Sequence, residues 1–536
     1  LEVTQTEVVA KAFATLNLAT GEVADEADRT FTMKAIPTAS DGEFPVAGGY
    51  KYLSMDYLLV GADKATVDVA FNYGGPQNRT FTNVPVQRNY RTNIYGSLLT
   101  NTTDFNVVIE PAFATTNYNL GALYTASQIG GAVTLSDNVD FDRTIAVQPG
   151  KTMSVNLNGK TVKNTTDLWE NPSVPNSWSL FSVRGTDSKL TLSGDGDVIA
   201  KANDCYAIDV QGGGHLVIEG GHYNGNIHAV YVTEGVAEIK GGTFEVQQKY
   251  PDAEKADEFV LNCLDENYKN GTAKIIVTGG TFIGFNPGDC KAEGNGTNFV
   301  APGYASIPNG TAADGREIWK VIPVTRNNII AALEKQGAKV CISNDYQGGA
   351  YLSKDDITST LMLNKATITP IPNKMSTINI EGTNLNVTGT GKFVGPSNSY
   401  TTTGAFWVQH SNTLNIDGNI SVESGTNSHF NACVIVFNGT VNISNGYFHS
   451  SVSKDGSSSP CIYLFGNTGV AYANITGGVF EADGDAMFII NCDDTNKSRC
   501  HVKVMGGTFV GFNPADNTAD GAHTNYVATG YKSVET

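Results

Sequence analysis

One segment occurs twice in this chain, and this duplication constrains the fold more than any other feature of the sequence. Thr278–Pro287 reads Thr-Gly-Gly-Thr-Phe-Ile-Gly-Phe-Asn-Pro, and Met505–Pro514 reads Met-Gly-Gly-Thr-Phe-Val-Gly-Phe-Asn-Pro. The upstream segments Phe259–Cys263 and Phe488–Cys492 also match. The chain therefore contains two copies of one unit, and each copy has to be built from repeated elements.

Within each copy, a short apolar strand is followed by Gly-Gly or Asn-Gly, one residue and an aromatic residue. The aromatic positions are Tyr223, Phe244, Phe282, Phe448, Phe480 and Phe509. Coils of about 20 to 30 residues with this pattern predict a parallel β-helix. Glycine tolerates the positive φ of the corners, and we expect the aromatic residues of successive coils to stack in a continuous core. The polar insertions 247–258 and 451–460 are predicted to project as loops.

A short helix is predicted at residues 327–336, with Asn327 or Asn328 as its N-cap. Leu123–Gly131 has a similar position before the first copy. A β-helix needs a cap at its end, because an open coil edge would pair with other chains. A second cap in mid-chain favours two tandem right-handed parallel β-helices over one long β-helix.

The N-terminal part shows the period of two residues that is typical of half-buried strands. In Ala65–Phe71 the apolar side chains Val67, Val69 and Phe71 would share one face. Further strands are predicted at Arg29–Ile36, Tyr52–Val60 and Asp104–Glu110. Polar turns between them predict an antiparallel β-sandwich.

The segments Asn83–Leu99 and Asp104–Pro111 resemble the end of a fimbrillin-like β-sandwich, found in surface adhesins and pilus-related lipoproteins of Gram-negative gut anaerobes. The repeated coils resemble the pectate-lyase-like right-handed β-helices that accompany such domains. These resemblances imply an exported protein of the cell surface or outer membrane. The first strands and the lipid-anchoring cysteine of that family are missing, so we expect a fragment whose signal and lipid anchor lie upstream.

We therefore predict an all-β chain of three domains. An incomplete fimbrillin-like β-sandwich would occupy residues 1–115. The first copy of the β-helix would occupy residues 118–324, and its duplicate, the second copy, residues 325–536.

Charge and cysteine usage exclude several classes of partner. The formal net charge of the 536 residues is −18 and only 16% of them are charged, against about 25% in typical domains. Nucleic acids and anionic membranes bind basic patches, so neither is an expected partner. No apolar run reaches about 18 residues, so no transmembrane segment is predicted. There is no Cys-x-x-Cys motif, and we expect neither a metal nor a cofactor.

The eight cysteines are expected to be free, mostly buried thiols. Cys492 has Cys500 across a turn and could form a disulfide with it, but the first copy has Ala273 where the second has Cys500. Positions that exchange cysteine for alanine behave as small core residues.

No set of catalytic residues is assigned from the sequence. Polysaccharide lyases and hydrolases of this fold need clustered acidic residues, and Asp493 with Asp494 is the nearest candidate. The alternative is a solvated turn. His222 and His228 have no third ligand at metal-binding spacing and are interpreted as surface or turn residues.

The best candidate for ligand binding is the loop 164–178, which holds Trp169, Trp178 and Asp167. Exposed tryptophan stacks on the apolar face of a sugar ring, while polar neighbours bind its edge. The alternative is that both tryptophans pin the loop to the β-helix.

The resemblance and the missing catalytic set favour a non-enzymatic, adhesin-like cell-surface protein that binds a glycan or a surface protein. One alternative is a polysaccharide lyase or hydrolase of the β-helix type. Another is a structural spacer in a surface assembly. An architecture of this kind hosts many activities, so the site has to decide between them.

Overall fold

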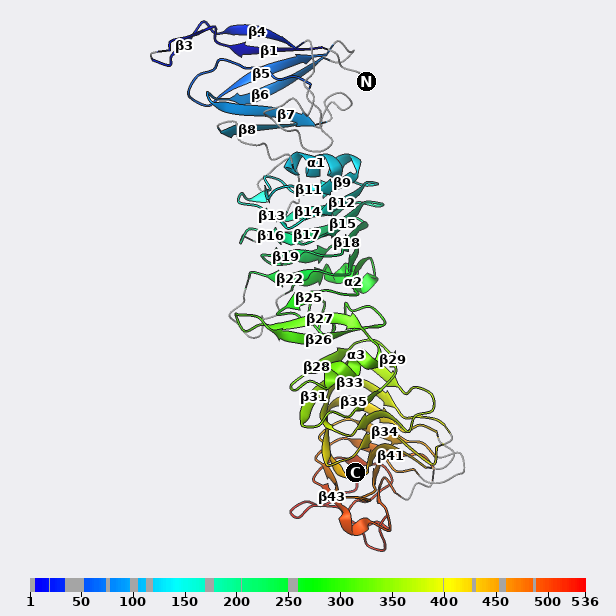
Figure 1. Cartoon of the computed structure of the whole chain (residues 1–536). Coiled ribbons are helices and arrows are strands. Elements are labelled where there is room, and N and C mark those ends of the chain that lie inside the picture. Colours follow the sequence, from blue (N-terminus) through cyan, green and yellow to red (C-terminus); the bar gives the residue numbers. More distant parts are fainter. Residues whose placement is uncertain are drawn as a thin grey trace. The chain divides into compact units, whose positions relative to one another are not determined.

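The protein is all-β in a computed structural model (Figure 1), as the sequence predicts. The structure describes residues 5–18, 20–33, 53–73, 78–96, 105–111, 119–168, 178–203, 205–248, 259–398, 400–426, 430–452, 459–484 and 488–536. The α-helices among these residues are α1 (Asn119–Ile129), α2 (Asp265–Asn270) and α3 (Arg326–Leu333). None of the described helices is long and apolar enough to span a membrane.

The chain divides into two compact units. The N-terminal unit comprises residues 1–201 and 211–214, and the C-terminal unit comprises residues 202–210 and 215–536. The domain boundaries predicted from the sequence stay predictions.

The N-terminal unit begins with antiparallel strands. These are β1 (Thr6–Ala12), β2 (Thr15–Leu16), β3 (Val23–Ala24), β4 (Ala27–Met33), β5 (Ala65–Asn72), β6 (Arg79–Val86), β7 (Tyr90–Gly96) and β8 (Phe105–Pro111). One sheet has the order β4-β1-β5-β6, and β7 pairs with β8. Val69 and Phe71 are buried in its core, so the predicted alternation of β5 is confirmed. The strand predicted at Tyr52–Val60 is wrong, because residues 54–60 pair with no strand.

After α1, the pairing changes from antiparallel to parallel. The strands are β9 (Gly131–Thr134), β10 (Val139–Asp140), β11 (Ile145–Val147), β12 (Thr152–Asn156), β13 (Lys160–Lys163), β14 (Ser179–Arg184), β15 (Lys189–Ser193) and β16 (Gly196–Ile199). Each strand pairs in parallel with the third strand after it, as β9 does with β12 and β12 with β15. Three strands thus complete one repeat.

The same pattern holds through the rest of the first copy, of which residues 211–214 belong to the N-terminal unit and the other residues to the C-terminal unit. The strands of this part are β17 (Tyr206–Gln211), β18 (Gly214–Ile218), β19 (His222–Gly225), β20 (Val230–Val232), β21 (Gly235–Ile239), β22 (Thr243–Val246), β23 (Leu261–Cys263), β24 (Ala273–Val277) and β25 (Thr281–Ile283). Strands β19, β22 and β25 pair in parallel, with Tyr223, Phe244 and Phe282 in register.

An antiparallel hairpin separates the two copies. Strands β26 (Tyr304–Thr311) and β27 (Glu317–Pro323) pair with each other, β27 also pairs with β25, and β26 with β28 of the second copy. Helix α3 follows the hairpin. Its N-cap is Thr325, whose hydroxyl accepts a hydrogen bond from the backbone N–H of Asn328, so the predicted Asn327 or Asn328 cap is wrong.

The second copy adds seventeen strands, mostly in parallel pairs. They are β28 (Lys339–Ile342), β29 (Tyr346–Gln347), β30 (Ala350–Leu352), β31 (Ile357–Thr369), β32 (Ser376–Ile380), β33 (Thr383–Val394), β34 (Thr402–Val408), β35 (Asn412–Glu423), β36 (Phe430–Val436), β37 (Gly439–Ile443), β38 (Tyr447–Ser450), β39 (Ile462–Leu464), β40 (Ala471–Ile475), β41 (Val479–Ala482), β42 (Ile490–Cys492), β43 (Cys500–Val504) and β44 (Thr508–Phe509). One sheet has the order β30-β32-β34-β36-β39-β42.

The predicted stacking of aromatic residues is confirmed in both copies. The ring centroid of Phe244 lies 5.2 Å from that of Tyr223 and 5.1 Å from that of Phe282. In the second copy, Phe480 lies 4.9 Å from Phe448 and 5.0 Å from Phe509. These distances match the spacing of neighbouring strands, so each coil contributes one ring to each column.

Candidate functional site

Four asparagines form a ladder on the outer face of the second copy. Asn386, Asn415, Asn442 and Asn474 lie in register on β33, β35, β37 and β40. From Asn415 onward, each amide Nδ2 donates to the Oδ1 of the preceding asparagine, at 2.7 Å, 2.7 Å and 2.8 Å along the chain. We call this row the asparagine ladder.

The strand pattern explains why these side chains face outward. In β37 the side chains of Val441 and Ile443 are buried, while Asn442 between them is half-buried on the opposite face. The same alternation holds for Asn474 between Ala473 and Ile475 in β40. Because parallel strands pair without a shift here, the apolar positions stack inside the protein and the amides stack outside.

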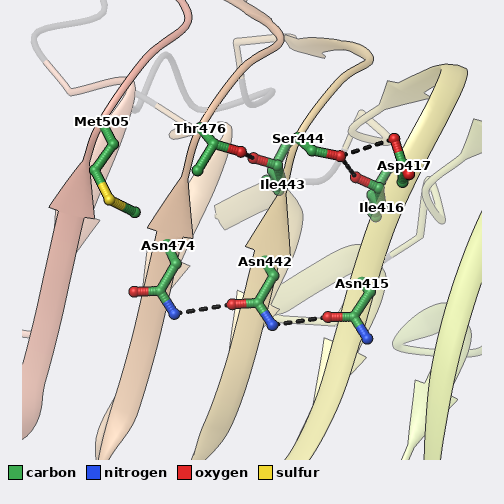
Figure 2. Close-up of a pocket in the computed structure, with 9 residues that line it drawn as sticks. All are labelled: Asn415, Ile416, Asp417, Asn442, Ile443, Ser444, Asn474, Thr476 and Met505. Atoms are coloured by element: carbon green, nitrogen blue, oxygen red, sulfur yellow. Dashed lines mark hydrogen bonds between the residues drawn. The ribbon is translucent and has the colours of Figure 1, made fainter.

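A second row of side chains runs beside the ladder and lines a surface depression with it (Figure 2). The depression has a volume of about 360 Å³. The Ser444 hydroxyl donates to Oδ1 of Asp417 at 2.9 Å, and the Thr476 hydroxyl donates to the carbonyl of Ile443 at 3.2 Å. Met505 supplies an apolar side chain at the end of the row. Amides, hydroxyls, one carboxylate and one thioether thus surround the hollow.

An exposed aromatic residue flanks the ladder. Tyr472 lies two residues before Asn474 on β40, so both side chains are on the same face, and Tyr472 is 41% exposed. Its ring centroid lies 5.2 Å from that of His501 on the neighbouring strand β43. Lys503, in register with Asn474, continues the row of ladder side chains on β43.

The ladder amides retain hydrogen-bonding capacity. An asparagine side chain has two N–H donors and an oxygen with two lone pairs. Within the described residues, the rungs use one N–H and one lone pair of Asn442. The second donor and the second lone pair of Asn442 have no partner among these residues.

The first copy lacks these features. Aligning Ile475–Phe480 with Ile239–Phe244 puts Glu238 opposite Asn474 and Val236 opposite Tyr472. Aligning Ile443–Phe448 with Ile218–Tyr223 puts Val217 opposite Asn442. The duplication therefore shares its core and differs on this outer face.

The ladder is not among the sites predicted from the sequence, although the sequence contains a signal of it. The segments Leu414–Ile416, Val441–Ile443 and Ala473–Ile475 each hold one asparagine between two apolar residues. In a β-helix, recurrence of one polar residue at the middle of equivalent strands indicates an outward row.

The residues predicted to bind a ligand belong to the N-terminal unit. Trp169 lies outside the described residues. Trp178 is described and is 42% exposed. Asp167 forms an ion pair with Lys201, whose Nζ lies 2.6 Å from Oδ1 of the carboxylate. Ligand binding by Asp167 and Trp178 stays a prediction.

The acidic pair at the end of β42 organises a turn. Oδ1 of Asp493 accepts hydrogen bonds from the backbone N–H groups of Thr495 and Asn496, both at 3.1 Å, and from the Asn496 amide. Its Oδ2 accepts from the Tyr463 hydroxyl at 3.0 Å, and burial together with this carboxylate raises the pKa of Tyr463. Asp494 is exposed. Both oxygens of Asp493 thus have structural partners.

The two histidines considered as ligands lie in different surroundings. Nε2 of His222 lies 3.0 Å from Oε1 of Glu245, whose Oε2 accepts from Arg316 at 2.6 Å. His228 is buried rather than at the surface, which corrects its interpretation as a surface or turn residue. In the part of the chain that the structure describes, no three His, Cys, Asp or Glu side chains could hold a metal ion together.

Comparison with known proteins bears only on the N-terminal part. A family of unknown function, DUF6562, matches residues 2–134. This match spans the predicted β-sandwich and the beginning of the first copy, and it ends far before the asparagine ladder. No curated protein and no solved structure matches the chain.

Proposed function

We propose that the chain is a non-enzymatic, adhesin-like protein of the cell surface that binds a glycan through the asparagine ladder face. Its architecture would be an incomplete fimbrillin-like β-sandwich followed by two tandem right-handed β-helices. The antiparallel pairing before α1 and the parallel pairing of every third strand after it support this architecture.

The observation that carries the proposal is the combination of the ladder with exposed Tyr472. Sugar rings have an apolar face that stacks on an aromatic ring and hydroxyl groups around the edge that both donate and accept hydrogen bonds. Tyr472 offers such a ring, and Asn442 and Asn474 offer donors and acceptors beside it. Both kinds of group lie on the same sheet face.

Charge favours a neutral glycan over an anionic one. The formal net charge is −18, which repels anionic polymers at low ionic strength. Asp417 contributes a further carboxylate to the depression. One positively charged side chain, that of Lys503, lies at the edge of the ladder row, in register with Asn474.

The competing enzymatic hypothesis has less support. A lyase or hydrolase would need Asp493 to take part in proton transfer or metal binding. Its two oxygens already accept hydrogen bonds from Tyr463, Thr495 and Asn496. The Asp493–Asp494 pair is therefore better explained as part of the turn.

Replacing Tyr472 with alanine in the full chain is expected to weaken glycan binding by about 10-fold, since an aromatic contact contributes about 0.5–1.5 kcal/mol beyond its buried area. Asn442→Val combined with Asn474→Val is expected to weaken binding at least as much, because a ligand would lose two amides. A glycan array identifies the ligand, and calorimetric titration with it measures the dissociation constants.

Val236→Ala is the matched control, because Val236 occupies the position of Tyr472 in the first copy and should leave binding unchanged. Trp178→Ala tests the loop predicted from the sequence. If Trp178→Ala abolishes binding while Tyr472→Ala does not, the ladder is not the site. If the chain binds no glycan, the proposed ligand class is wrong.

A further inference from the structure

Two cysteines lie on either side of one turn near the end of the second copy. Cys492 is the last residue of β42, Cys500 is the first residue of β43, and the turn 493–499 connects them. Cys492 is buried and Cys500 is half-buried, and all eight cysteines of the described chain are free thiols. The thiols of Cys492 and Cys500 are close enough for each to influence the pKa of the other.

The register of the strands explains this contact. Cys492 pairs with Leu464 on the neighbouring strand β39. The Sγ of Cys500 lies 3.5 Å from the carbonyl oxygen of the same Leu464 and 3.6 Å from that of Asn496. The side chain of Cys500 thus points back across the turn toward the strand end that holds Cys492.

The turn is fixed by its own hydrogen bonds. The backbone N–H of Asn496 donates to the carbonyl of Asp493 at 3.0 Å, and that of Arg499 donates to the carbonyl of Asn496 at 2.8 Å. The Arg499 guanidinium donates to Oδ1 of Asn496 at 2.6 Å. These bonds hold the turn between the two cysteines in one conformation.

The environment distinguishes the roles of the two sulfurs. The neighbouring Cys492 side chain lowers the pKa of the Cys500 thiol. The same contact and burial raise the pKa of Cys492. Since the thiolate is the reacting form, the half-exposed Cys500 is the sulfur that would attack a disulfide first, and Cys492 would resolve the product.

We propose that Cys492 and Cys500 are a disulfide-forming pair, oxidised by exchange with a low-molecular-weight disulfide such as glutathione disulfide. The Cys500 thiolate attacks one sulfur of glutathione disulfide, forming a mixed disulfide and releasing one glutathione thiolate. The Cys492 sulfur, after losing its proton to solvent, attacks the Cys500 sulfur and releases the second glutathione. Both cysteines are oxidised, and one glutathione disulfide is reduced to two thiols.

The chain contains matched comparisons for this reaction. In the first copy, Cys263 corresponds to Cys492, but Ala273 stands where the second copy has Cys500. Cys433 and Cys461 are both fully buried. An oxidant from solvent can reach Cys500 without unfolding of the core, whereas it cannot reach Cys433 or Cys461. This inference is independent of the proposed glycan binding.

The test uses the reduced full chain, treated with glutathione disulfide and then alkylated under denaturing conditions. The expected result is two fewer alkylated cysteines than in the untreated chain. Digestion with trypsin and a glutamyl endopeptidase, without reduction, should give the peptide Ala482–Lys497 linked to Cys500–Lys503, and reduction should separate the two.

Cys492→Ser is expected to leave Cys500 as a mixed disulfide with glutathione, and Cys500→Ser is expected to form neither bond at Cys492. The proposal is overturned if no thiols are lost, or if the linked peptides contain Cys433 and Cys461 instead. Stable glutathione adducts on Cys500 of the unmodified chain would also overturn it, because they would show that Cys492 does not resolve them.

Discussion

Replacing Phe480 with alanine is expected to lower the free energy of unfolding of the C-terminal unit by about 3–5 kcal/mol. The Phe480 side chain is fully buried. Its ring lies between those of Phe448 and Phe509, with centroid distances of 4.9 Å and 5.0 Å and nearly parallel planes. Alanine would remove both ring contacts and leave a cavity that the fixed spacing of the coils prevents from closing. Urea denaturation followed by circular dichroism measures the loss.

A control for Phe480→Ala is the same substitution at the end of the column formed by Phe448, Phe480 and Phe509. Phe509 is the last ring of the column and is only half-buried. Phe509→Ala should therefore cost clearly less than Phe480→Ala. Phe480→Leu, which keeps much of the volume, should also cost less. Equal losses at Phe480 and Phe509 would contradict a column whose interior rings are held from both sides.

The core of the repeats could be predicted because few residues satisfy its constraints. Gly478 has a φ of +99°, and a Cβ there would lie 3.2 Å from the carbonyl oxygen of Gly446. Glycine is thus required at the corner for its backbone conformation and for close approach. The aromatic residue two positions later then points inward. The same positive φ recurs at Gly221, Gly242, Gly280, Gly446 and Gly507, each two residues before an aromatic residue, so the requirement leaves a visible pattern in the sequence.

The strand wrongly predicted at Tyr52–Val60 shows where the alternation of apolar and polar residues misleads. Leu53 and Leu58 pack against the core that includes Val69 and Phe71. The hydroxyl of Thr6 donates to the carbonyl of Leu53 at 2.7 Å, which replaces a strand pairing with a side-chain contact. The apolar residues of this segment are therefore partly buried against the sheet, although the segment is not a strand of it.

The asparagine ladder was not predicted because it depends on register between coils of unequal length. Asn415, Asn442 and Asn474 are not evenly spaced in the sequence, since loops of different size intervene. Only the strand pairing aligns them. The predicted binding site was an insertion, the loop 164–178, whereas the ladder lies on regular strands of the repeat. The residues that the two copies share form the core, whereas the residues that differ between them lie on this outer face.

Acidification is expected to destabilise the C-terminal unit through His228. Its side chain is 7% exposed, and burial lowers its pKa to about 4. Nδ1 lies 2.8 Å from the carbonyl oxygen of Phe259, so the neutral imidazole donates from Nδ1. The Asn262 amide can then donate to Nε2, 3.4 Å away. Protonation of Nε2 would bring two donors face to face in a pocket walled by Tyr206 and Tyr231.

The sign of the effect follows from the two pKa values. An unfolded histidine titrates near 6.5, whereas folded His228 titrates at about 4. Between these values the unfolded chain binds one more proton, so stability falls as the pH drops from about 6.5 to about 4. The loss should reach about 3 kcal/mol at pH 4 and should level off just below that pH.

The measurement is the difference between the pH profiles of His228→Gln and the unmodified chain. Glu293 acts in the opposite sense, because burial raises its pKa to about 7, so its contribution to stability falls as the pH rises from about 4.5 toward 7. Subtracting the profiles cancels this contribution. His228→Gln should lose stability at pH 7.5 but should no longer lose the additional amount at pH 4.5. Val230→Ala, a buried variant that does not titrate, should keep the full acid sensitivity; if His228→Gln keeps it too, the acid sensitivity does not come from His228.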